Sequence, residues 1–230
     1  MKTSLKSEIF DLLSNYPETK EFINHLSEIG ELLFFGGSVR DYYVYNSYNN
    51  MPRDFDIAIK LESSQELIFE RFVEEYSYTK NRFGGYKVVI ENIEFDLWNF
   101  KNTWAFKENK LSTEEENLVK SVYLSIDGIA YNFNKDKLYD EELRTTFSNK
   151  QIDIVLKDNP QKDLNLLRAL IFRKRYELDF SVELKQEYLR SIELNENYVE
   201  KLYQLQFSHY HNERLTRNEV RVEIENICFC

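Results

Sequence analysis

Glycine and proline are scarce in this sequence, with six glycines and three prolines among 230 residues. Long flexible linkers are rich in glycine, serine or proline, so this composition leaves little room for one. The sequence also has no apolar run near the roughly 20 residues that a membrane-spanning helix needs. We therefore expect a folded protein with no membrane segment and no long linker.

Cysteine is rarer still, and both cysteines, Cys228 and Cys230, lie at the end of the sequence. A disulfide between residues so close along the chain would be strained. Their spacing also differs from the Cys-x-x-Cys pattern of a metal site. The first residues, MKTSLKSEIFDLL, lack the apolar region and the small-residue cleavage site of a secretion signal. These absences predict two reduced thiols in a cytoplasmic protein.

Positive charge is in deficit, because 30 lysines and arginines face 40 acidic residues and the formal net charge is −10. Proteins that coat nucleic acid without specificity use lysine and arginine to neutralise phosphates. The charge balance argues against that class of protein. It is compatible with a local basic groove, because net charge governs solubility and steering rather than fold or chemistry.

The chain is well supplied with apolar and aromatic side chains, at 42% and 15% of the residues. This is enough to form a core, and disordered chains contain fewer such residues. Apolar spacing predicts the α+β class, with strands and helices mixed over the first two-thirds and helices over the last third. We place the boundary near residue 158, giving one domain over 1–158 and a helical region over 159–230.

The individual elements follow from periodicity and from turn residues. Helices are predicted over 4–14, 18–29, 63–75 and 113–121, from Ser38, from Pro160, and as a pair across 182–208. Strands are predicted over 31–35, 54–60, 86–91, 93–98, 122–133 and 151–156, with a hairpin turn at Glu91 and Asn92. The last twenty residues give no clear pattern.

Two carboxylates, Asp54 and Asp56, stand two residues apart in the strand predicted over 54–60. Side chains alternate between the faces of a strand, so these two point the same way. Unpaired carboxylates repel each other and are costly to bury, which a divalent cation resolves. Magnesium prefers carboxylate oxygens and substrate phosphates, and two such ions can activate a hydroxyl and stabilise leaving pyrophosphate. The pair predicts a site for two Mg²⁺ ions.

A third carboxylate is usually needed to complete such a site, and Glu94 and Asp96 share one face of the strand over 93–98. We favour Asp96, because the apolar residues Leu97 and Trp98 follow it, as in a buried central strand. The pattern of alternation alone does not choose between the two carboxylates.

A glycine pair precedes these strands, where Gly36, Gly37 and Ser38 lie between a predicted strand and a predicted helix. Glycines let backbone amides approach a phosphate, and the N-terminus of a helix favours an anion. Alone, a Gly-Gly pair is usually only a turn, and an acidic-x-acidic triplet is usually a solvated strand edge. Their combination with a third carboxylate is a stronger indication of a phosphate-transfer site.

The segments GGSVRD over 36–41 and RDFDIAI over 53–59 carry a family resemblance. They resemble the head domain of class II tRNA nucleotidyltransferases and bacterial poly(A) polymerases, within the polymerase-beta-like nucleotidyltransferase superfamily. The resemblance implies a mixed-sheet head followed by a helical neck. It implies that Asp54, Asp56 and Asp96 bind metal and catalyse transfer, and that the glycine turn cradles the phosphates. Arg40 fits the family pattern too, either as a nucleotide contact or as a structural pair with Asp41.

The resemblance continues more faintly to about residue 178. LSIDGIAY over 124–131 is similar to the family motif Phe-Thr-Ile-Asn-Ala-x-Ala-Tyr, with Asp127 in place of asparagine and without the paired arginines that precede it. It places Asp127 among the nucleotide-binding residues. LLRALIFRKRYEL over 166–178 is similar to the start of the neck, and it adds Arg168 to the same group. The base-pairing set Glu-Asp-x-x-Arg that precedes the neck is not in register here, where residues 161–165 read QKDLN.

The sequence therefore predicts a magnesium-dependent nucleotidyltransferase that moves a nucleoside monophosphate from a triphosphate to a hydroxyl. By resemblance, the acceptor is the 3′ end of a tRNA or another RNA. The acidic charge favours a first alternative, a transferase that modifies a protein or a small molecule. The altered motif at Asp127 permits a second alternative, a relative that binds nucleotide without catalysis, although the intact carboxylates speak against it.

Overall fold

The computed structural model describes residues 4–48, 50–81 and 84–228. By their contacts these residues form two compact units, the first comprising 1–121 and 127–141, the second 122–126 and 142–230. The chain thus enters the second unit briefly before it completes the first. The domain boundary near residue 158 stays a prediction.

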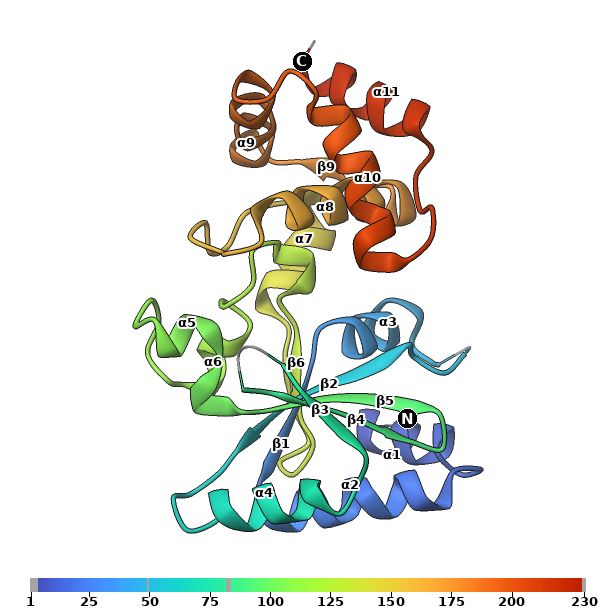
Figure 1. The fold of residues 1–230 in the computed structure, drawn as a ribbon, viewed down its shortest axis with the longest axis vertical. Helices are drawn as coiled ribbons and strands as arrows, with labels where there is room; N and C mark the ends of the chain where they lie inside the picture. The colour runs from blue at the N-terminus through green and yellow to red at the C-terminus, as the bar shows by residue number, and fades with distance from the viewer. Residues whose placement is uncertain (1–3, 49, 82–83, 229–230) are drawn as a thin grey trace. The chain divides into compact units, whose positions relative to one another are not determined.

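The first unit is formed around a seven-stranded mixed sheet, in the order β3-β4-β5-β2-β1-β6-β7 (Figure 1). Its central strands β2 and β5 run parallel, whereas the other neighbouring strands are antiparallel. The strands are β1 (Glu31–Phe35), β2 (Asp54–Lys60), β3 (Tyr78–Lys80), β4 (Tyr86–Ile90), β5 (Ile93–Asn99), β6 (Ala130–Asn132) and β7 (Lys137–Tyr139). This confirms the predicted α+β class and its mixed sheet.

Helices cover both faces of this sheet. They are α1 (Leu5–Leu12), α2 (Pro17–Ile29), α3 (Gly37–Tyr45), α4 (Glu66–Glu74), α5 (Trp104–Lys107) and α6 (Glu115–Leu118), with a short 3-10 turn η1 (Phe100–Asn102). On one face, Phe22 of α2 packs on Phe95, and Phe95 stacks on Phe55 with 5.5 Å between ring centroids. On the other face, Phe106 and Leu118 bury Leu33 and Ala58. The sheet is therefore the middle layer of this unit.

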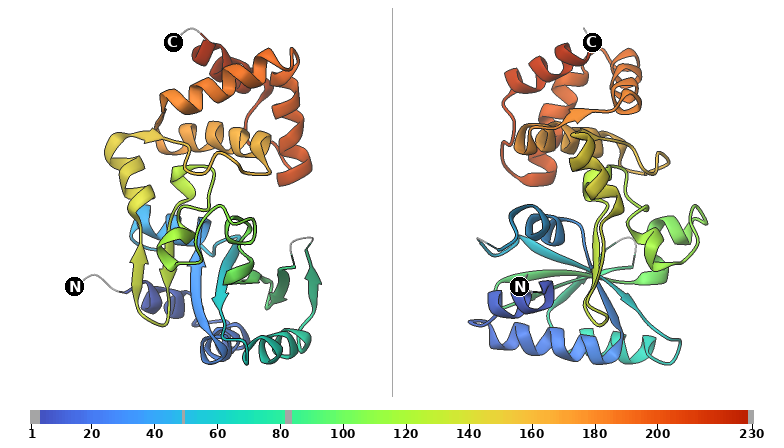
Figure 2. Two further views of the ribbon diagram at one scale, coloured as in Figure 1. Left: turned by 90° about the vertical axis from the view of Figure 1, so that its left-hand side faces the viewer. Right: turned by 180° about the vertical axis from the view of Figure 1, so that it is seen from behind.

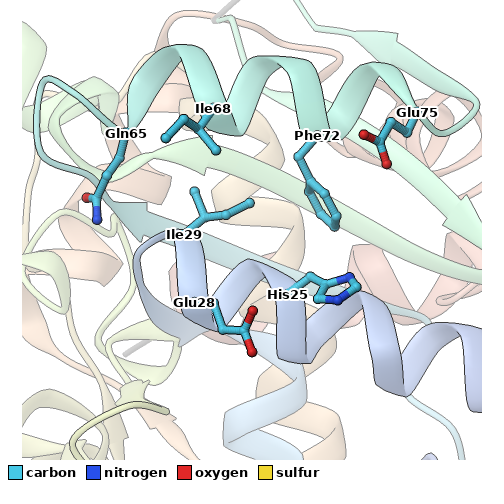
Figure 3. A pocket seen from close by; sticks show the side chains of 7 residues that line it. All are labelled: His25, Glu28, Ile29, Gln65, Ile68, Phe72 and Glu75. Carbon is cyan, nitrogen blue, oxygen red and sulfur yellow. The ribbon is translucent and has the colours of Figure 1, made fainter.

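Helices α2 and α4 lie side by side, as the three views show (Figures 1 and 2). Phe22 and Phe72 stack between them with 5.4 Å between ring centroids. A shallow pocket of about 430 Å³ opens between the same helices, with His25, Ile68 and Phe72 among its lining residues (Figure 3).

The second unit is mainly helical. Its helices are α7 (Glu141–Asn149), α8 (Lys162–Tyr176), α9 (Val182–Glu193), α10 (Tyr198–Tyr210) and α11 (Arg217–Cys228). Helix α10 contacts both α8 and α11, and α11 contacts α9 (Figure 2). Two short strands, β8 (Gln151–Ile152) and β9 (Asp179–Phe180), pair in parallel. The C-terminal stretch that had no clear sequence pattern thus contains α11.

The strand predicted over 122–133 is wrong for its first part. The structure has a 3-10 turn η2 (Ser125–Asp127), and only β6 continues as a strand. Leu124 and Ile126 are fully buried, which gives the segment its strand-like composition. Three backbone hydrogen bonds join this segment to 153–156, but they form only one isolated bridge, between Leu124 and Ile154, and no regular strand pairing. Burial rather than regular sheet pairing therefore explains the apolar pattern.

None of the helices in the described residues is both long and apolar enough to cross a membrane. Cys228 is an exposed free thiol, and Cys230 lies outside the described residues.

Candidate active site

Four carboxylates line up at one end of the two parallel central strands. In the register of β2 and β5, Asp54 lies opposite Glu94 and Asp56 lies opposite Asp96. All four are intermediate in exposure, whereas Phe55 between the first two is fully buried on the other face. The sheet thus brings together the acidic residues that the sequence placed on separate strands, and both third-carboxylate candidates share their face.

Two cations compensate this negative charge. Arg53 donates to Asp54, with 2.5 Å between Nη2 and Oδ2. Lys87 of β4 donates to Glu94 at 2.8 Å and lies 3.7 Å from Asp96. Sequence reasoning missed Lys87. The predicted hairpin turn at Glu91 and Asn92 could have identified it. Counting residues back from that turn along both strands places Lys87 opposite Asp96.

The pKa of Asp96 reflects this crowding. Partial burial raises the pKa of its carboxyl, and the nearby charges of Asp54 and Glu94 raise it further. Lys87 and Arg53 oppose that shift without cancelling it, so the pKa stays above its ordinary value. Asp96 therefore holds its charge less readily than an ordinary aspartate.

The four carboxylates are ligands that suit a hard divalent cation such as Mg²⁺, and they lie on the strands next to the glycine turn. In the described part of the chain, however, no three acidic, histidine or cysteine side chains converge closely enough to hold an ion as they stand. Arg53 and Lys87 explain part of this, because they engage Asp54 and Glu94. Holding an ion would require the carboxylate side chains to turn toward one another.

The glycine turn lies against the same carboxylates. Gly36 has a φ of +63°, a conformation that favours glycine, and a Cβ there would meet Asp56 Oδ2 at 3.7 Å. Gly36 is the N-cap residue of α3 and has no side chain with which to cap the helix. The Ser38 side chain is buried, and its hydroxyl has no hydrogen-bond partner within the described residues. A helix N-terminus that begins at glycine and a buried hydroxyl with no partner among the described residues are features of an anion site.

Arg40 and Asp127 form a buried ion pair, with 2.6 Å between Nη1 and Oδ1. Their side chains are only 7% and 11% exposed, while Asp41 lies 3.6 Å from Arg40 Nε. The pair ties α3 to the segment before β6. This is the structural role that sequence reasoning allowed for Arg40, now with Asp127 as its stronger partner. A nucleotide contact by either residue stays a prediction.

Arg168 belongs to the second unit. It lies on α8 with its guanidinium 5.3 Å from the centroid of the Phe172 ring. Its neighbours Arg173 and Lys174 are engaged with Glu223 and Glu219 of α11. Much of the basic character of this helix therefore serves helix packing, and nucleotide binding by Arg168 stays a prediction.

The site thus combines a mixed sheet, a glycine turn and paired carboxylates on adjacent strands. Neither the family models nor the curated proteins match this chain. Solved structures do match it. A CCA-adding enzyme in complex with ATP superposes with a TM-score of 0.64 at 16% identity, over 96% of this chain and 54% of that one.

Two further solved structures agree. The CCA-adding enzyme of Thermotoga maritima in complex with tRNA gives a TM-score of 0.63 at 15% identity, over 96% of this chain and 54% of that one. A tRNA nucleotidyltransferase with a primer tRNA and an incoming ATP analogue gives 0.56 at 16% identity, over 86% of this chain and 58% of that one. The chain spans a little over half the length of these structures. The likeness confirms the predicted fold, which is that of the CCA-adding enzymes.

Proposed function

We propose that the chain is a magnesium-dependent nucleotidyltransferase that transfers a nucleoside monophosphate from a nucleoside triphosphate to the 3′ hydroxyl of a tRNA or another RNA. The observation that carries the proposal is the register of β2 and β5, which sets Asp54 and Asp56 beside Glu94 and Asp96. A fold shared with CCA-adding enzymes supports it. Residues 1–158 would form the catalytic head and 159–230 a helical neck.

Each part of the site has a role in this reaction. Gly36, Gly37 and Ser38 would cradle the triphosphate at the N-terminus of α3, beside Asp56. The amide of Gly36 already donates to the carbonyl of Ile129, so the amide of Gly37 and the hydroxyl of Ser38 would make the contacts. Asp54, Asp56 and Asp96 would hold two Mg²⁺ ions. When bound, these ions stabilise the charge that develops on the reacting phosphate and on the leaving pyrophosphate.

The proton of the acceptor hydroxyl needs a base as its oxygen attacks the α-phosphorus and pyrophosphate leaves. Asp96 would help to accept it, which is the role that the family resemblance implies for this carboxylate. Arg40 and Asp127 would keep α3, and with it the glycine turn, in a fixed orientation.

The direct test is to incubate the purified protein with each labelled nucleoside triphosphate and total cellular RNA, with magnesium and with a chelator. Label should enter RNA only with magnesium. Asp54→Ala and Asp56→Ala should each abolish transfer while thermal unfolding stays cooperative, because each removes a carboxylate that stabilises the reacting phosphate. Near-normal turnover in either variant would contradict the site assignment.

A transferase acting on a protein or small molecule is the second candidate, and the net charge of −10 favours it, because an acidic surface attracts RNA poorly. A protein extract and a metabolite extract are therefore assayed in parallel with RNA. Label that enters one of these and leaves RNA unlabelled would select the second candidate. Magnesium-dependent stabilisation by a triphosphate with no transfer to any acceptor would indicate a non-catalytic relative.

A further inference from the structure

A second cavity of the first unit shares no residue with the candidate active site. It lies among α1, α3 and the β6–β7 hairpin and measures about 520 Å³. Pockets that hold small molecules measure roughly 300–1,000 Å³. Helix α3 contributes the walls of this pocket from its second half, whereas its first residues form the glycine turn.

The walls of this pocket are largely aromatic and apolar. Tyr42 and Tyr43 come from α3, and Tyr131 comes from β6. Leu5 and Leu138 add apolar surface, and Leu138 is 41% exposed. Aromatic faces attract ammonium and guanidinium groups, and apolar surface favours a ligand with a hydrocarbon portion.

The charged residues that line the pocket, Asp136 and Asp140, are both acidic. Asp136 accepts a hydrogen bond from Tyr131, with 2.5 Å between the oxygens. Asp140 is half-buried, yet within the described residues it has no hydrogen bond and no ion pair. A half-buried carboxylate without a counter-charge is costly, and a cationic ligand would remove that cost.

The surroundings reinforce this negative potential. Burial raises the pKa of Tyr42, and the charges of Glu8 and Asp136 raise it further. Tyr48 packs on Tyr42, with 5.6 Å between ring centroids, and its buried hydroxyl has no hydrogen-bond partner among the described residues.

We propose that this pocket binds a small organic cation, with ammonium groups on a hydrocarbon chain as in a polyamine. The ammonium group would pair with Asp140 and Asp136 and lie against the tyrosine rings. The hydrocarbon chain would cover Leu5 and Leu138. The two carboxylates disfavour phosphates and nucleotides, so the pocket is distinct in chemistry from the glycine turn.

Calorimetric titration of the purified protein with spermidine tests this, at about 0.15 M salt so that diffuse charge attraction is screened. We expect saturable binding of one spermidine per chain and no binding of the neutral analogue 1,6-hexanediol. Asp140→Asn should weaken spermidine binding roughly tenfold or more, since about 1.4 kcal/mol corresponds to a factor of ten. Asp136→Asn should weaken it as well, while asparagine still accepts the bond from Tyr131.

Glu74→Gln is the matched control, because it removes one negative charge from an exposed position on α4. It should bind spermidine as the wild type does, and thermal unfolding should show that all three variants are folded. Equal weakening by Glu74→Gln would show diffuse attraction to an acidic protein and overturn the proposal. No saturable binding by the wild type would overturn it too, whatever the outcome of the transfer assay.

Discussion

At the scale of single residues, Asp96 and Glu94 differ in their neighbours although they share a face of β5. Asp96 lies opposite Asp56 and its side chain is 29% exposed. Glu94 lies opposite Asp54, is 43% exposed and is bonded to Lys87. Asp96 is therefore less exposed than Glu94. Its partner on the neighbouring strand is Asp56, the aspartate that lies beside the glycine turn.

We expect Asp96→Asn to slow transfer by roughly a hundredfold or more, the usual loss when charge stabilisation is removed from a reacting centre. Glu94→Gln should cost only a few-fold, because Glu94 already uses one oxygen on Lys87. Single-turnover rates at saturating magnesium and triphosphate measure both. A larger loss in Glu94→Gln than in Asp96→Asn would reverse the assignment and make Glu94 the third metal ligand.

The carboxylates illustrate what residue patterns can and cannot predict. Alternation along a strand was sufficient to place Asp54 with Asp56 on one face. The pairing of Asp56 with Asp96 needed the order of the strands, which no local pattern contains. The contact between Arg40 and Asp127 could not be predicted either, because 87 residues separate the two and only the fold brings them together.

At the scale of elements, α6 is fixed to the sheet by one buried carboxylate. Glu115 accepts hydrogen bonds from Lys60 at 2.6 Å, Lys135 at 2.9 Å, Tyr139 at 2.7 Å and Asn132 at 3.0 Å. These partners come from the strands or from the β6–β7 turn, whereas the run of three glutamates at 114–116 reads as a solvated helix start. The sequence predicted a helix over 113–121 but not this anchor, and the helix is only four residues long.

Glu115→Gln should lower the free energy of unfolding by about 1–3 kcal/mol, because it weakens bonds from two ammonium groups to a buried acceptor. Burial alone would raise the pKa of Glu115, but the bonds from Lys60, Lys135 and Tyr139 outweigh burial and hold it well below its ordinary value. A depressed carboxyl pKa stabilises the fold fully above the unfolded value of about 4.3 and progressively less below it.

Urea unfolding at a series of pH values measures this contribution. The difference between wild type and Glu115→Gln should be constant near neutral pH and should shrink as the pH falls below about 4. Glu116→Gln is the matched control, because Glu116 is exposed and its side chain pairs with Lys137 on the surface. A difference that grows as the pH falls would show that Glu115 is not held in its charged form.

At the scale of the whole molecule, the two units differ in how far the family resemblance extends to their side chains. The first unit retains the glycine turn and the carboxylates. In the second unit, residues 161–165 stand where the family has its base-pairing set Glu-Asp-x-x-Arg. They read QKDLN and lack that set. Two residues of this stretch that could contact a base already have partners. Asp163 bonds to Tyr198 and Lys201, and Asn165 bonds to Asn159.

Nucleotide selection should therefore be looser than in an enzyme that builds a fixed CCA end. Fixed addition needs side chains that pair first with cytosine and then with adenine. A well-placed bidentate contact to a base is worth about 1–3 kcal/mol by analogy with base readout in DNA. Losing that set should lower selectivity by roughly tenfold or more, since 1.4 kcal/mol is a factor of ten. Arg168 on α8 is the residue that we expect to replace one such contact.

Incorporation of all four triphosphates on one acceptor, at equal concentrations and with product lengths resolved, measures this selectivity. We expect several nucleotides to be added at comparable rates, and Arg168→Met to flatten whatever preference exists. Arg173→Met is a control on the same helix, because Arg173 pairs with Glu223 and should affect stability rather than choice of base. Ordered addition of two cytidines and one adenosine would contradict the prediction, and it would show that other residues of the chain read the base.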